Sequence, residues 1–280
     1  MVKKFWEGRN RHKLFYLLLL IPAFAIVGTC ILLPLVKSIL MSFQEYRMVG
    51  PVETRGKWAG FANFFAAARG KELSNALYVT LNFVFFVVAL EFFFALGTAL
   101  SLNGGISGLK QGKKNVLQTL ILLPWVTPTV ICALLWAWMF QPQYGVWNYV
   151  LLQWGLIQAP LAWLVDASLA LPSVIVTALW RDLPFMFLML FAGLQTIPKE
   201  PYEAALIDGA GTLRRFFSIT LPFLRNVIRT TLLMAIITNF KQFPLFWTLT
   251  QGGRWIELRT YRFLHIKKRS SILILGKRLP

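Results

Sequence analysis

The most regular feature of the chain is a series of long apolar runs separated by short polar segments. A helix needs about 20 apolar residues to cross the hydrocarbon core of a bilayer. Runs of that length predict five membrane spans, at 14–36, 76–102, 116–140, 169–194 and 226–249. The pattern therefore predicts an all-α polytopic membrane protein whose transmembrane domain occupies residues 14–249.

The basic residues are distributed unevenly among the segments that join these runs. Segments 1–13, 103–115 and 196–225 carry clustered Lys and Arg, whereas 141–168 has neither. Loops rich in Lys and Arg stay in the cytoplasm. We therefore expect a multi-pass protein of the inner membrane with a cytoplasmic N-terminus at 1–13, followed by an uncleaved signal-anchor helix.

Composition narrows the function further. The chain is 57% hydrophobic and 14% charged, with a net charge of +18. In a soluble protein such a charge would suggest binding to nucleic acid. Here the positive residues lie in the segments between the apolar runs, so we expect a lipid bilayer and no nucleic acid as partner. Cys30 and Cys132 lie in apolar runs, and His12 and His265 lie far from acidic clusters. We expect no metal, no cofactor and no catalytic group.

The segment 196–225 predicts two short helices. Pro201 suits a first helical turn, and Gly209 and Gly211 end that helix. Thr212 is expected to cap a second helix, which Leu221–Pro222 ends before the next span. Both helices have an apolar face, which indicates either a docking site or an elbow at the membrane surface.

The same segment carries a spaced motif: Glu203-Ala204-Ala205, three residues, Gly209, nine residues, Ile219, one residue, and Leu221-Pro222. Its residue types and spacing resemble the signature loop of binding-protein-dependent ABC importer permeases. Further segments at 75–80, 123–124, 140–145 and 192–198 resemble the sugar branch of that family. The resemblance covers about residues 10–253.

This resemblance implies a type I ABC importer transmembrane domain with its last span missing. It implies three partners: a second homologous permease, cytoplasmic ABC ATPase subunits and an extracytoplasmic solute-binding protein. Glu203 would pair with a basic residue of the ATPase, Ala204 and Ala205 would form the close-packed surface, and Gly209 would be the bend. The chain has no phosphate loop of the form G-x-x-x-x-G-K-[ST], so we expect a transport subunit without its own ATPase site.

Several polar residues interrupt the predicted spans. Arg181 and Asp182 fall mid-span, and their 100° separation on a helix argues against a simple mutual pair; Pro184 is expected to weaken the helix there. Further candidates are Glu91, Asn239 with Lys241 and Gln242, and Trp136, with Trp138 as a second ring. Such groups line a substrate pathway or are satisfied by neighbouring helices, and the sequence leaves both interpretations open. An ion-coupled secondary carrier is the alternative function that intramembrane acids allow.

The tail at 250–280 departs from the family. After Gly253 the family has an outside loop and a sixth span, but here eight Lys and Arg follow and the longest apolar run is 272–275. The tail is either a genuine terminus or the product of a frameshift, in which case the chain would be a truncated, inactive permease. A frameshift predicts an apolar run of about 20 residues in another reading frame past codon 253.

Overall fold

A computed structural model describes residues 19–45, 56–103 and 111–251 of the chain. The chain divides into two units, 1–70 with 268–280 and 71–267, which are taken separately below. Predictions for 1–13 and for 252–280 lie outside the described residues and stay predictions.

The first unit consists of one apolar helix followed by a small aromatic cap. The helix Leu19–Ser42 has a π-helical turn at Gly28–Leu32 and continues as α2 (Leu33–Ser42). Strands β1 (Gln44–Glu45) and β2 (Lys57–Trp58) pair antiparallel, and α3 (Ala62–Arg69) follows. No part of the helix's most apolar stretch is buried within the first unit, so its apolar side chains require lipid or other protein surface around them.

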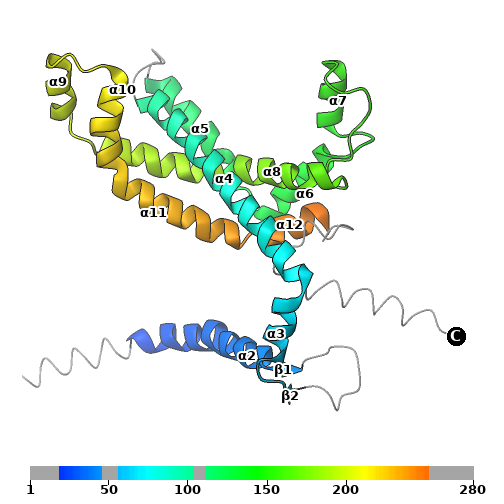
Figure 1. Ribbon diagram of the computed structural model, residues 1–280. Coiled ribbons are helices and arrows are strands. Elements are labelled where there is room, and N and C mark those ends of the chain that lie inside the picture. The colour runs from blue at the N-terminus through cyan, green and yellow to red at the C-terminus, as the bar shows by residue number, and fades with distance from the viewer. Residues whose placement is uncertain (1–18, 46–55, 104–110, 252–280) are drawn as a thin grey trace, which may run out of the picture. The chain divides into compact units, whose positions relative to one another are not determined.

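The second unit is built around two long helices, α4 (Lys71–Asn103) and α8 (Ala167–Gln195). Figure 1 shows α4 crossing α8, with α11 beside them. Small buried residues allow the helices to approach closely: the core contains Ala76, Ala95 and Ala99 of α4 and Ala170, Ala178 and Gly193 of α8. Asp166 caps α8 by accepting hydrogen bonds from the backbone and hydroxyl of Ser168, which hold the pKa of Asp166 below its ordinary value.

The predicted span 116–140 differs from a single helix. It consists of α5 (Gln111–Val126) and α6 (Thr129–Met139), which are bent by 96° relative to one another. Pro128 sits at the break; it has no N–H to donate, and its ring disfavours helical geometry at Thr127. The segment is thus a broken span or a re-entrant loop.

The segment after α6 folds around one buried amide. Asn148 of α7 (Val146–Gln153) donates to the carbonyl of Leu161 and accepts from its N–H, at 2.9 and 3.0 Å. The same side-chain oxygen accepts from Trp163 Nε1 at 3.0 Å. These bonds fix the connection between α7 and α8.

The second helix of segment 196–225 does not end at Leu221–Pro222, contrary to the sequence expectation. After α9 (Glu200–Ile207), α10 (Thr212–Arg215) runs through a π-helical turn, Phe216–Thr220, into α11 (Leu221–Phe240). Pro222 has no backbone N–H, and the wider turn that precedes it carries the chain into α11 without a break. Thr212 makes no capping bond; the N-cap residue is Gly211.

The predicted span 226–249 is interrupted near its middle. Helix α11 ends at Phe240, and α12 (Phe243–Thr250) begins after Lys241 and Gln242. Phe246 of α12 packs edge-on against Phe83 of α4, with ring centroids 4.7 Å apart.

Among the described residues, four helices are long and apolar enough to cross a membrane, and five if α5 and α6 together form one span. The expected all-α polytopic fold is confirmed. Its core lies where α4, α6, α8, α11 and α12 meet, and exposed apolar side chains cover the outer sides of these helices.

Candidate coupling loop and intramembrane polar cluster

In the candidate coupling loop, residues 196–225, backbone hydrogen bonds hold the end of α9. Gly209 N–H bonds the Leu206 carbonyl at 3.1 Å, and Ala210 N–H bonds the Ala205 carbonyl at 2.8 Å. These two bonds form a Schellman motif, which needs a left-handed residue after the helix. Gly209 supplies it, with φ at +73°. Helix α9 therefore ends just before Gly209, and the role of this glycine in ATPase coupling stays a prediction.

The loop exposes more apolar surface than a connection requires. Ile207 is 88% exposed and Leu213 is 75% exposed, with Leu206 and Phe217 also outside. Glu203 and Ala204 are exposed beside them on α9, and Ala205 is half-buried. Within the described part of the chain, Glu203 makes no ion pair. An exposed apolar face beside an exposed carboxylate is typical of a docking surface.

A hydrogen bond joins the two arms of the loop. The hydroxyl groups of Tyr202 and Thr220 lie 2.8 Å apart, which ties α9 to the π-helical turn. Ile219 and Thr220 are buried, Leu221 is half-buried and Pro222 is exposed. The motif residues thus divide by position: those on α9 face outward, while Ile219 anchors the loop to the helices below.

Arg181 and Asp182 form a mutual pair, contrary to the sequence expectation. Arg181 Nε donates to Asp182 Oδ1 at 2.8 Å, and Asp182 Oδ2 accepts from Gln242 Nε2 at 2.9 Å. A second guanidinium nitrogen of Arg181 donates to Thr129 Oγ1. The side chains are long enough to bridge the angle between neighbouring helix positions. Helix α8 also continues without a break through Pro184.

Glu91 of α4 and Asn239 of α11 come together beside α8. Glu91 is 1% exposed, and Asn239 Nδ2 lies 3.5 Å from Glu91 Oε1. Asn239 Nδ2 also donates to the Ala235 carbonyl at 3.0 Å, while its Oδ1 has no hydrogen-bond partner among the described residues. A buried amide oxygen without a hydrogen bond is costly, so this position is suited to meeting a donor group.

Trp136 is packed among other rings. It stacks on Trp147 at 5.8 Å and contacts Phe140 and Trp180 at 5.4 and 5.9 Å. With 6% exposure its ring has no free face in this structure. Trp138 is 54% exposed and lies near Tyr144.

We define the polar cluster as Glu91, Thr129, Arg181, Asp182, Asn239 and Gln242. Thr129 is not among the residues that the sequence indicates, whereas Gln242 belongs, with Asn239 and Lys241, to the polar patch predicted for the last span. Thr129 follows Pro128 at the start of α6; a proline within a predicted span is the signal that marks such a break. The pairing among α4, α6, α8 and α11 has no counterpart in local sequence.

Comparison with known proteins follows the same picture. Residues 101–267 match the sequence model of the family described as "Binding-protein-dependent transport system inner membrane component". The match runs past Gly253, where the sequence resemblance was expected to stop.

Three curated relatives carry transport names. The trehalose/maltose transport system permease protein MalF of Thermococcus litoralis is 35% identical over 86% of this chain and 78% of its own length. The sulfoquinovosyl glycerol permease SmoG of Agrobacterium fabrum is 31% identical over 94% of this chain and 83% of its own length. The diacetylchitobiose permease DasB of Streptomyces coelicolor is 34% identical over 84% of this chain and 71% of its own length.

A solved structure shares the fold. The crystal structure of a bacterial ABC transporter involved in the import of the acidic polysaccharide alginate superposes with a TM-score of 0.78 and 22% identity. The superposition covers 98% of this chain and 89% of that one. A second structure of an alginate ABC transporter, in complex with a periplasmic protein that carries an alginate pentasaccharide, gives a TM-score of 0.73.

Proposed function

Because this chain belongs to the binding-protein-dependent transport system inner membrane component family, and is thus a permease subunit of an ABC importer, we propose that it carries a sugar or a related small solute into the cytoplasm. It would form the path with a second, homologous permease. Cytoplasmic ATPase subunits would drive it, and an external binding protein would deliver the solute. The N-terminus would lie in the cytoplasm.

The observation that carries the proposed mechanism is the outward-facing α9. Its exposed Ile207 and Glu203 offer an apolar contact and a charge to a partner, and no described residue of the chain covers them. The Tyr202–Thr220 bond and buried Ile219 connect this surface to α11. Movement of a docked ATPase would therefore reach the bundle as movement of α8 and α11, the two helices that flank the loop.

The docking role predicts a specific loss on charge reversal. Glu203→Lys should abolish co-purification of the ATPase subunit or weaken it by at least tenfold, because a like charge replaces an attractive one at the interface. Glu200→Lys makes the same change of charge one turn away on the same helix and is the matched control; because it leaves the Glu203 contact in place, it should weaken binding far less. ATP-driven uptake in vesicles should follow the binding result.

Equal retention of the ATPase by wild type, Glu203→Lys and Glu200→Lys would refute Glu203 as the contact. Uptake that needs an ion gradient but neither ATP nor a binding protein would replace the importer with the secondary carrier.

The polar cluster supports a polar solute. It places hydrogen-bonding groups from α4, α6, α8 and α11 near the middle of an apolar bundle, where the cost of burial favours a functional role. We propose that Asn239, with its unpartnered Oδ1, and the neighbouring Glu91 border the solute path. The Arg181–Asp182 pair would hold the helices that form it. Trp136 would support this site through its ring contacts.

The chemistry of the solute is inferred from relatives. MalF, SmoG and DasB are named for trehalose and maltose, sulfoquinovosyl glycerol and diacetylchitobiose. These compounds share hydroxyl-rich sugar rings, which suit amide and carboxylate partners.

A further inference from the structure

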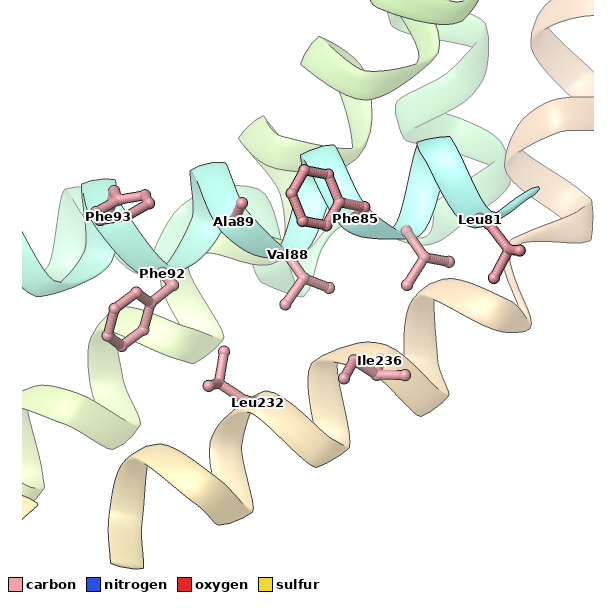
Figure 2. Close-up of a pocket in the computed structure, with 9 residues that line it drawn as sticks. Leu81, Phe85, Val88, Ala89, Phe92, Phe93, Leu232 and Ile236 are labelled. Carbon is pink, nitrogen blue, oxygen red and sulfur yellow. The ribbon is translucent and has the colours of Figure 1, made fainter. Parts of the chain in front are cut away.

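An apolar groove runs between α4 and α11. It has a volume of about 430 Å³ and is lined by side chains such as Val88, Phe92, Leu232 and Ile236. Figure 2 shows Leu232 and Ile236 on α11 facing Val88 and Phe92 across the gap. The groove is open along one side, and its lining offers no polar group that would hold a water molecule.

Two arginines continue the groove along α11. In a helix of 3.6 residues per turn, Arg225 and Arg229 are separated by about 40° and Ile236 lies about 20° from Arg225, so they share a face with Leu232. Both arginines are exposed, and neither makes an ion pair with any described residue. The groove therefore leads along one helix face to two unpaired positive charges.

Helix lengths indicate that the arginines lie near the depth of lipid headgroups. If the midpoint of α8 lies at the middle of the membrane, the bond from Gln242 to Asp182 near that midpoint puts the C-terminal end of α11 near the middle of the membrane as well. From Phe240, about 16 Å of helix lead back to Arg229 and about 22 Å to Arg225. Half of a hydrocarbon core is about 15 Å. Because side chains on α11 tilt toward its N-terminus, both guanidinium groups point away from the hydrocarbon.

We propose that this surface is a binding site for one anionic phospholipid. An acyl chain fills the groove between α4 and α11, and the headgroup phosphate is held by Arg225 and Arg229. Apolar surface beside two unpaired guanidinium groups matches the two parts of such a lipid, since arginine binds phosphate oxygens in a bidentate manner. The leaflet is the one on the side of the 196–225 loop; the site itself rests only on the membrane location of α4 and α11.

The headgroup contact is tested by titrating the full-length protein, in a neutral detergent, with phosphatidylglycerol. Native mass spectrometry counts retained lipid, and the thermal unfolding midpoint reports saturation. Arg225→Gln combined with Arg229→Gln should raise the half-saturating lipid concentration about tenfold or more. The control, Lys37→Gln with Arg69→Gln, removes two exposed charges of the first unit and should leave the titration unchanged. Phosphatidylcholine and inorganic phosphate are the comparison ligands; both should bind weakly.

The groove is tested separately by filling it. Ile236→Trp places a large ring in the groove and should abolish phosphatidylglycerol retention, while Ile237→Trp, about 100° away on α11 and outside the groove, should not. Saturation by inorganic phosphate alone would show that the site binds phosphate rather than a lipid, and would refute the proposal. Loss of the second permease with Ile236→Trp, at unchanged lipid titration, would show that a helix occupies the groove instead. These binding measurements do not depend on transport, so their outcome tests the lipid site and not the proposed importer mechanism.

Discussion

At the scale of single residues, the coupling loop depends on one backbone conformation. Gly209 adopts φ of +73° so that the N–H groups of Gly209 and Ala210 can close the end of α9. A side chain in this region of backbone space costs about 1–2 kcal/mol. Gly211, two residues later, has φ of −65° and no such requirement.

We predict that Gly209→Ala loosens the end of α9 without unfolding the protein. Hydrogen exchange at the amides of residues 209 and 210 should accelerate by about five- to thirtyfold, since their protecting bonds are lost more often. Gly211→Ala is the matched control and should leave both rates unchanged. Equal rates in all three proteins would mean that the loop tolerates the strained alanine.

A second residue-scale prediction concerns the buried ion pair. Asp182→Leu or Arg181→Met alone leaves an uncompensated charge among buried side chains that are about 10% exposed, and should destabilise the protein by about 3–5 kcal/mol. The double replacement removes both charges and should recover most of the loss. Thermal unfolding of the wild type, the two single variants and the double variant gives the interaction free energy of the pair. If the changes in the free energy of unfolding simply add, the two charges do not interact.

At the scale of elements, the contact between α8 and α11 depends on a missing side chain. A Cβ on Gly193 would lie 3.0 Å from Leu224 Cδ2 and 3.1 Å from the Val227 methyl groups. The glycine therefore allows the two helices that flank the coupling loop to approach closely. Gly97 on α4 is a helical glycine whose Cβ would meet no atom within 4 Å.

Gly193→Leu should push α8 and α11 apart and lower the free energy of unfolding by about 1–3 kcal/mol. It should also weaken coupling, measured as the uptake per ATP hydrolysed, because the loop is carried by these helices. The control, Gly97→Leu, should have the same free energy of unfolding as the wild type or a slightly higher one. A Gly193→Leu protein with unchanged stability would mean that the helix contact relaxes without cost.

At the scale of the whole molecule, the arrangement of loops about the membrane can be measured directly. With Cys30 and Cys132 replaced by alanine, a single cysteine at the exposed Leu213 should react with a membrane-impermeant maleimide only from the cytoplasm. A single cysteine at Trp154, 72% exposed after α7, should react only from outside. Labelling of both positions from the same side would contradict the proposed topology.

The local sequence determined much of the molecule. Long apolar runs form helices, since in lipid every backbone N–H and C=O group must be hydrogen-bonded within the protein. Pro201 and Gly209 mark the start and the end of the first helix of the loop. The prolines at 128 and 222 also mark irregular backbone, but whether a proline bends a helix, widens a turn or is absorbed, as Pro184 is, depends on its neighbours.

Only the tertiary structure decided which polar groups meet. Glu91 and Asn239 are separated by 148 positions, and Thr129 lies 52 positions from Arg181. Their pairing follows from the crossing of α4, α6, α8 and α11, which is set by side-chain volumes along whole helices and not by any residue's neighbours in sequence. The sequence alone thus specified which segments are helical, while the tertiary structure decided where those helices break and helix crossing created the polar cluster and the groove beside it.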